Sequence, residues 1–188
     1  MAERGYMGMR RPRHNMGRVD WIGCEAVGLP GQRTFRILAR TGDQAAEMWL
    51  EKEQLQALVD AIMRMLAELG SEPEMDITGM AIGGTNAKPS DFPSNPAIEF
   101  QVGALGLRYD PTRDMIALEA FERNSEENDP PELRCIASRD QMERLQNNAT
   151  EVIAGGRPKC PFCGTPLPAP GMPHFCPPTN GHHKLSDD

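Results

Sequence analysis

Two segments of the sequence repeat apolar residues at the spacing of an amphipathic helix, and each ends at glycine. An amphipathic helix must bury its apolar face against another element, so these segments constrain the fold strongly. Ser138 caps the second helix, with Gln141 three residues later completing a capping box. The apolar faces comprise Leu55, Leu58, Val59, Ile62, Leu66 and Leu69 in the first helix, and Met142, Leu145, Ala149, Val152 and Ile153 in the second.

Three short segments with strand character precede each helix: 19–27, 35–40 and 45–50 in the first half, and 104–107, 115–121 and 133–136 in the second. Aligning Glu53-Gln54-Leu55 with Asp140-Gln141-Met142 superimposes the two helical faces. We therefore predict an α+β fold in which duplicated β-β-β-α units form an antiparallel sheet packed by two helices, with a small C-terminal zinc module.

Composition divides the chain into three parts, the second of which contains a linker. Residues 1–17 carry four arginines without apolar periodicity, which predicts a disordered basic leader. Residues 18–156 form the pseudo-duplicated α+β domain, with halves 18–70 and 97–156. A linker rich in glycine and proline, residues 71–96, joins the halves. Residues 157–188 form a zinc-binding tail.

The tail contains cysteines and histidines at metal-ligand spacing. Cys160 and Cys163 form a C-x-x-C turn that supplies two thiolates to one tetrahedral ion, and Cys176 supplies a third. His174 lies two residues before Cys176, so both side chains point to the same side of an extended segment, and His174 is the favoured fourth ligand. His182 is the alternative. Four protein ligands leave no open position for water, so the expected Zn²⁺ is structural rather than catalytic.

Charge and cysteine usage restrict the setting. The 188-residue chain carries a net charge of −7, which argues against broad adhesion to nucleic acid or anionic membrane. It has no run of about 18 apolar residues and no apolar signal-peptide segment, so we expect a soluble cytoplasmic protein without membrane contact. In a reducing cytosol, Cys24 and Cys135 are expected to be small buried hydrophobes.

Three classes of function follow from these features. All four histidines lie in the leader or the tail, so the core has no obvious general base, and a non-enzymatic interaction or adaptor module with a protein partner is the favoured hypothesis. An enzyme of unknown substrate is the weakest. The alternative is a nucleic-acid-binding protein that uses an arginine-bearing sheet face. For either function, we expect the binding surface on the open sheet face or at the seam between the halves. The possible binding face consists of Arg33, Arg36, Arg40, Arg108 and Arg113.

Four sequence blocks carry a resemblance to a known family. They are residues 28–35 (GLPGQRTF), 50–55 (LEKEQL), 103–110 (GALGLRYD) and 154–164 (AGGRPKCPFCG). Together they resemble an uncharacterised bacterial family, domain-of-unknown-function family 3090, over residues 18 to 183. The resemblance implies a tail with C-x-x-C, then H-x-C-P, then Asn-Gly followed by an aromatic residue or histidine, which here is His182. It implies no activity.

Overall fold

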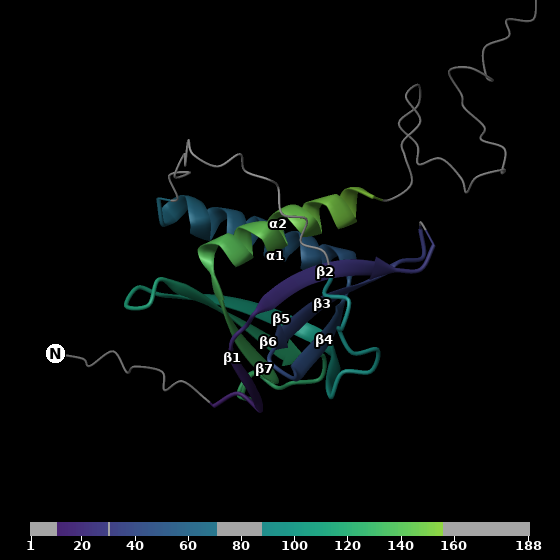
Figure 1. The fold of residues 1–188 in the computed structure, drawn as a ribbon, viewed down its shortest axis with the longest axis horizontal. Helices are drawn as coiled ribbons and strands as arrows, with labels where there is room; N and C mark the ends of the chain where they lie inside the picture. Colours follow the sequence, from purple (N-terminus) through teal and green to yellow (C-terminus); the bar gives the residue numbers. More distant parts are fainter. Residues whose placement is uncertain (1–10, 30, 71–87, 156–188) are drawn as a thin grey trace, which may run out of the picture.

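The computed structural model describes residues 11–29, 31–70 and 88–155, which form a curved sheet with two helices on one side (Figure 1). The α+β class is confirmed, and the order strand-strand-strand-helix occurs twice, preceded by one additional strand. The elements are β1 (His14–Arg18), β2 (Trp21–Val27), β3 (Thr34–Thr41), β4 (Gln44–Leu50), α1 (Lys52–Glu68), β5 (Ile98–Asp110), β6 (Met115–Glu122), β7 (Leu133–Ser138) and α2 (Arg139–Ala154).

The sheet has seven strands in the order β1-β7-β6-β5-β4-β3-β2. Strands within each half pair antiparallel, as predicted, but β4 pairs with β5 and β1 with β7 in parallel, so the prediction of an antiparallel sheet is wrong at these two joins. For β4 and β5 the reason is connectivity: α1 lies between them in the chain, and a helical connection returns the chain in the same direction.

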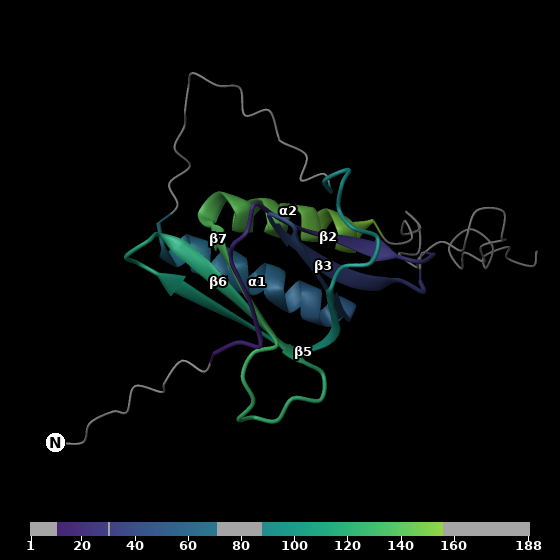
Figure 2. The same ribbon diagram turned by 60° about the horizontal axis from the view of Figure 1, so that its bottom comes forward.

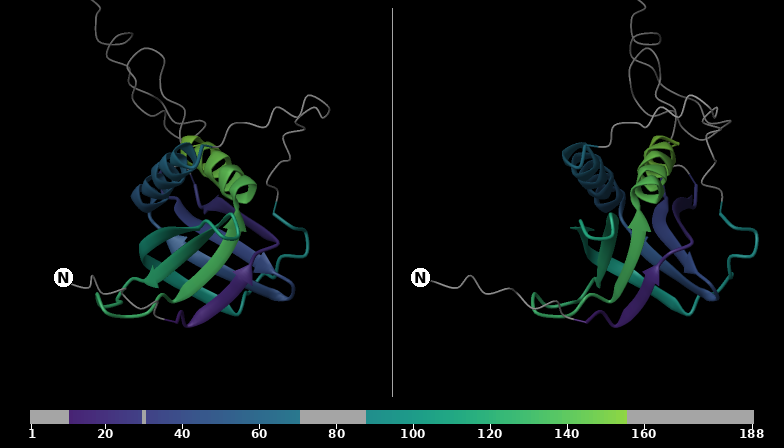
Figure 3. Two further views of the ribbon diagram at one scale, coloured as in Figure 1. Left: turned by 90° about the vertical axis from the view of Figure 1, so that its left-hand side faces the viewer. Right: turned by 60° about the vertical axis from the view of Figure 1, so that its left-hand side comes forward.

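The ends of the sheet are brought together by the chain itself. β1 and β2 occupy opposite ends of the strand order, yet only Val19 and Asp20 separate them. The Val19 N–H donates to Ile136 O of β7 at 2.9 Å, and the Asp20 N–H donates to Arg40 O of β3 at 2.8 Å. The sheet therefore curls almost into a barrel, as Figure 3 shows with both helices above its concave side.

The leader predicted over residues 1–17 is shorter than expected, because the structure begins a strand at His14. Met16 in this strand is buried in the core, and the Arg13 and His14 amides donate to the carbonyls of Pro131 and Glu132. A five-residue strand with a single buried side chain leaves no periodicity to detect. Residues 1–10 lie outside the described part, so a disordered leader there stays a prediction.

The main core lies between the concave face of the sheet and the two helices, which lie side by side in Figure 2. In β3, Phe35, Ile37 and Ala39 alternate in the sequence with Arg36, Leu38 and Arg40, and these three apolar residues are buried in this core. Leu38 points to the outer face, the side of the sheet away from the helices, where it packs with Ala45 and Phe92.

Phe92 belongs to the segment predicted to be a linker. Residues 71–87 of that segment lie outside the described residues, whereas Phe92 is only 8% exposed and packs edge-on against Trp21, with ring centroids 5.9 Å apart. The described end of the predicted linker therefore covers part of the outer face. Neither helix in the described ranges is long and apolar enough to cross a membrane.

Candidate functional site

Each of the two helices is attached to the sheet by a glutamine at its third position. Gln54 accepts a hydrogen bond from the Glu51 amide at 2.8 Å and donates to Val102 O and Gly103 O, both at 3.1 Å. We call the contact between α1 and β5 the first seam. Glu51 caps α1 although glutamate is not among the preferred N-cap residues, which is why the sequence did not predict this capping box.

The second seam is the contact between α2 and β2. Here Gln141 accepts from the Ser138 amide at 2.9 Å and donates to Val19 O and Asp20 O at 2.9 and 3.2 Å. The predicted Ser138 capping box is confirmed. The glutamines therefore join each helix to the backbone that follows a parallel strand pair, β4–β5 at the first seam and β1–β7 at the second.

A polar side chain fills the second seam. Asn148, seven residues after Gln141, accepts a hydrogen bond from the Cys24 amide of β2 at 2.8 Å. This amide lies on the β2 edge away from β3, so the asparagine completes the hydrogen bonding of the strand. The second seam is closed at this point.

The first seam is open at the corresponding point. Ala61, seven residues after Gln54, stands where α2 has Asn148, and Ala57 stands where α2 has Arg144. These small side chains leave a cavity of about 170 Å³ between α1 and β5, with Leu105 and Leu107 on the strand side. The cavity is mainly apolar in its lining residues.

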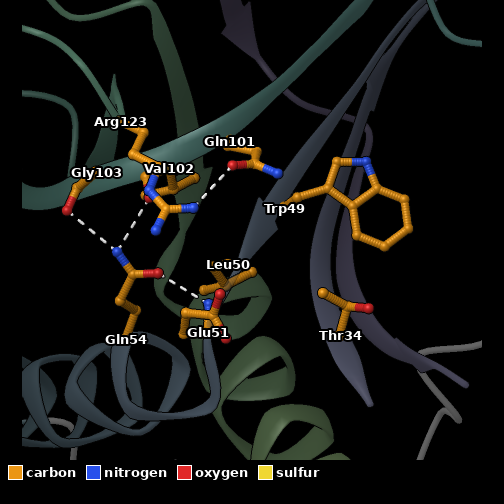
Figure 4. Close-up of a pocket in the computed structure, with 9 residues that line it drawn as sticks. All are labelled: Thr34, Trp49, Leu50, Glu51, Gln54, Gln101, Val102, Gly103 and Arg123. Carbon is orange, nitrogen blue, oxygen red and sulfur yellow. Dashed lines mark hydrogen bonds between the residues drawn. The ribbon is translucent and has the colours of Figure 1, made fainter. Parts of the chain in front are cut away.

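A second cavity, of about 220 Å³, adjoins the first because both are lined by Gln54 and Gly103 (Figure 4). We call the two cavities together the seam groove. Residues from both halves of the chain line the seam groove, so the groove lies where the two halves meet. The polar cavity is lined among others by Thr34, Trp49, Glu51, Gln54, Gln101 and Arg123.

Gly103 allows β5 and the residues after β6 to approach closely beside the groove. A Cβ atom at this position would lie 2.8 Å from Arg123 Cα and 2.8 Å from Glu122 O, which are backbone atoms that cannot easily move aside. The register of β5 against β6 also shifts here, between Val102 and Ala104. A bulge of this kind redirects the strand and often lies beside a site.

Arg123 is the only arginine or lysine that lines the described groove. Its Nη1 donates to Gln101 Oε1 at 3.1 Å, and Figure 4 shows the guanidinium lying between Gln101 and Gln54. Glu51 is the only carboxylate in the lining of the described groove, and it accepts a hydrogen bond from the Gln54 backbone amide in the capping box. The groove therefore offers hydrogen-bond donors at one end and apolar surface at the other.

The far end of the first seam is held by Arg139. Its guanidinium donates to Leu69 O at the end of α1 at 3.1 Å, to the Tyr109 hydroxyl at 2.9 Å and to Asp114. These bonds tie the β5–β6 hairpin to both helices. Hydrogen bonds from Tyr109 and then Arg139 hold the pKa of Asp114 below its ordinary value.

The five arginines of the predicted binding face do not gather in one place. Arg36 and Arg40 lie on the outer face of β3, but Arg33 donates instead to Val152 O of α2 at 3.5 Å. Arg108 forms an ion pair with Glu119 at 3.7 Å on the other half of the sheet, and Arg113 lies in the β5–β6 turn. The structure brings together only Arg36 and Arg40 of these five described arginines.

Arg36 is held by acidic neighbours on both adjacent strands. It forms ion pairs with Glu25 of β2 and Glu47 of β4, and its guanidinium lies 5.1 Å from the centre of the Trp49 ring. Burial raises the pKa of Glu25, but hydrogen bonds from Arg36 and Lys88 outweigh it, so the pKa lies below the ordinary value. Carboxylates thus already occupy the face that was predicted to bind nucleic acid.

The predicted zinc ligands Cys160, Cys163, His174 and Cys176, and the alternative His182, lie outside the described residues. Within residues 11–29, 31–70 and 88–155, no group of three His, Cys, Asp or Glu is placed to hold a metal ion. Cys24 and Cys135 are both buried and not joined by a disulfide. Burial raises the pKa of each thiol to about 12, with a smaller contribution from Glu25 for Cys24.

Comparison with known proteins gives one match. No curated protein and no solved structure matches the chain. A family model described as "Protein of unknown function (DUF3090)" matches residues 14–176, which include β1 and most of the cysteine-containing tail. The chain therefore belongs to the DUF3090 family.

Proposed function

We propose that this protein is a non-enzymatic interaction module and that the seam groove binds a segment of a partner protein. The observation that carries the proposal is the difference between two seams with the same construction. Ala61 leaves open at the first seam the space that Asn148 fills at the second. A binding groove requires unfilled space that is lined by both apolar and polar groups. The first seam has such a space at the position that a side chain fills in the second.

The lining favours a protein partner over a nucleic acid. A nucleic-acid groove needs several unpaired cations along a backbone track, and the described groove contains one, Arg123. Arg36 and Arg40 are paired with carboxylates. The apolar surface formed by Leu105 and Leu107 instead suits an aliphatic side chain of a peptide.

We also propose that the two halves are an internal duplication. Support comes from the repeated element order, the two parallel joins and the equivalent bonds of Gln54 and Gln141. Each half alone would expose the strand edges that the parallel joins cover, so neither is expected to fold alone. The seam groove then lies where the two copies have diverged.

For the tail, we propose a structural Zn²⁺ held by Cys160, Cys163, Cys176 and His174, in a cytoplasmic protein. The support is the ligand spacing in the sequence. Elemental analysis of protein purified without chelators should find one zinc per chain. Absence of zinc, or its retention after Cys160→Ser together with Cys163→Ser, would refute the site.

The groove is tested by filling it. Ala57→Leu places a larger side chain in the lining, whereas Ala67→Leu makes the same change on the same helix outside both cavities. Both alanines are exposed, so neither change should disturb the core. We expect peptides selected from a displayed library on the wild-type protein to bind Ala67→Leu equally and Ala57→Leu at least about tenfold more weakly.

Two results would contradict this proposal. One is equal binding of the selected peptides to Ala57→Leu and Ala67→Leu, because the binding surface would then lie elsewhere. The other is selection of no peptide, combined with retention of nucleic acid that nuclease digestion removes. Thermal unfolding of both variants serves as the folding control.

A further inference from the structure

We infer that the seam groove recognises a carboxylate and a neighbouring aliphatic side chain on an extended peptide, with Arg123 contacting the carboxylate. This inference rests on the proposed function and specifies its ligand. Arg123 lies at the polar end of the groove, and Leu105 and Leu107 lie at the apolar end. The two ends meet at Gln54 and Gly103, so one short segment can contact both.

Arg123 differs from the arginines that stabilise the domain through ion pairs. Arg36, Arg108, Arg134 and Arg139 each form an ion pair with a carboxylate. Among the described residues, the Arg123 side chain forms no ion pair and donates one hydrogen bond, to the neutral side-chain amide of Gln101. A guanidinium has five donors arranged for a carboxylate, so most of its capacity is available to a ligand.

Two acidic residues near the groove already have donors. Glu51 accepts from the first turn of α1, and Glu99 accepts from the Trp49 indole at 2.9 Å. The amino-terminal end of α1 adds partial positive charge to the same cavity. Local charge complementarity therefore favours an anionic group next to Arg123.

The second seam indicates how the peptide backbone is held. Cys24 pairs with Ile37 in β2–β3, and Leu107 pairs with Leu118 in β5–β6, where Ile37 and Leu118 are both fully buried. Leu107 thus corresponds to Cys24, whose amide donates to Asn148. A carbonyl oxygen of the bound peptide would take the place of the Asn148 oxygen at Leu107.

The net charge of the chain and the exposure of Arg123 together set the expected preference for acidic over amide peptides. Because the net charge is −7, long-range attraction does not assist an acidic ligand, and the preference must come from contact with Arg123. Arg123 is exposed, so its ion pair should be worth no more than a partly screened surface pair. We expect an acid-to-amide preference of about three- to fivefold.

The test uses the full chain and three heptapeptide sets with blocked amino termini, of which the first two also have amidated carboxyl termini. The first carries an internal aspartate next to leucine, the second carries asparagine in place of aspartate, and the third ends at leucine with a free carboxylate. Binding is followed by chemical-shift changes of the Gly103 and Leu107 amides. Either the first or the third set should bind about three- to fivefold more tightly than the second, which identifies the carboxylate as a side chain or a chain terminus.

Two variants complete the design. Arg123→Gln should remove the acid preference while the asparagine peptides still bind, and Ala61→Asn should weaken all sets by filling the seam as Asn148 does. Equal binding of acid and amide peptides, unchanged in Arg123→Gln, would overturn the carboxylate inference and leave the groove intact. No shift with any set would also overturn it, and the Ala57→Leu selection would then decide the proposed function separately.

Discussion

At the second seam, Asn148 accepts a hydrogen bond from the β2 backbone, whereas at the first seam Ala61 leaves a cavity against β5. The glutamines that join helix to strand are the same in both, as are the parallel strand pairs beside them. The two seams thus share the glutamine bonds and the parallel strand pairs that hold helix and sheet together. They differ in whether a side chain fills the space between the helix and the strand.

The outer face also differs between the two halves. Each half has a charged residue on its central strand that pairs with both neighbouring strands, but the sign of that charge is opposite in the two halves. In the first half, Arg36 on the central strand pairs with Glu25 and Glu47 on its two neighbours. In the second half, Glu119 on the central strand pairs with Arg108 and Arg134. Both arrangements satisfy a charge on the central strand from both sides, which indicates that cross-strand neutralisation rather than one sign of charge is required.

The largest effect should follow from breaking the first of these charge groups. Arg36→Met leaves Glu47, only 5% exposed, without its ion-pair partner and should lower the free energy of unfolding by about 3 kcal/mol. Glu119→Gln should cost less, about 1–2 kcal/mol, because Arg108 is half exposed and the glutamine oxygen can still accept a hydrogen bond from Arg134. Urea unfolding measures both, and Arg113→Met in the exposed turn should change stability by less than about 0.5 kcal/mol.

An Arg36→Met variant no less stable than Arg113→Met would show that the cross-strand group is not required for stability. Equal losses in Arg36→Met and Glu119→Gln would remove the difference between the halves.

Opening the closed seam should have the next largest effect. Asn148→Ala removes the acceptor of the Cys24 amide and should lower the free energy of unfolding by about 1–3 kcal/mol. Asn147→Ala, on the exposed side of the same helix, is the matched control and should be close to neutral. If the two asparagine variants unfold at the same urea concentration, the second seam does not depend on this bond.

The buried thiols make stability depend on alkaline pH. The pKa of Cys24 and of Cys135 is raised to about 12 in the folded state, above about 8.5 for an unfolded cysteine. Below about pH 8.5 both states are protonated, and between about 8.5 and 12 the unfolded state alone loses protons, so stability falls as pH rises. Each thiol should contribute a loss of about 1 kcal/mol by pH 9.5.

Chemical denaturation at pH 7.5 and 9.5 measures this loss, and Cys24→Ala and Cys135→Ala should each remove its own share. A pH dependence that is the same in wild type and both variants would exclude the cysteines as its source.

Closing the open seam should have the smallest effect on stability. Ala61→Asn introduces the side chain that α2 uses, but asparagine is a poorer helix former than alanine by about 0.6 kcal/mol. A new hydrogen bond worth about 1 kcal/mol should leave a net gain of less than about 1 kcal/mol. Ala67→Asn has the same loss of helix propensity but forms no new hydrogen bond. The midpoint of thermal unfolding should therefore be lower for Ala67→Asn than for Ala61→Asn. Equal midpoints would mean that the asparagine introduced by Ala61→Asn finds no partner on β5.

The strand and helix order of both halves could be predicted because periodicity and capping residues are local signals. Two features depend on distant partners and could not be read in this way: the strand at His14, which needs β7, and the parallel joins that curl the sheet. Alternation placed Arg36 on the outer face, but nothing local indicated that Glu25 and Glu47 lie beside it.

The groove residues Trp49, Gln54, Gln101 and Arg123 were not predicted, because they come from four separate segments. A signal was nevertheless present. The alignment of the two helices already set Ala61 against Asn148, and a small residue opposite a polar one at an otherwise matched position marks a difference between the two halves.

Amide hydrogen exchange at Leu107, compared with Cys24, tests the difference between the seams most directly. The Cys24 amide is bonded to Asn148, so it should exchange slowly, whereas Leu107 at the open seam should exchange faster in the wild-type protein. Ala61→Asn should slow Leu107 toward the rate of Cys24 and leave Cys24 unchanged. Equal protection of the two amides in the wild type, or no change at Leu107 in Ala61→Asn, would contradict the account.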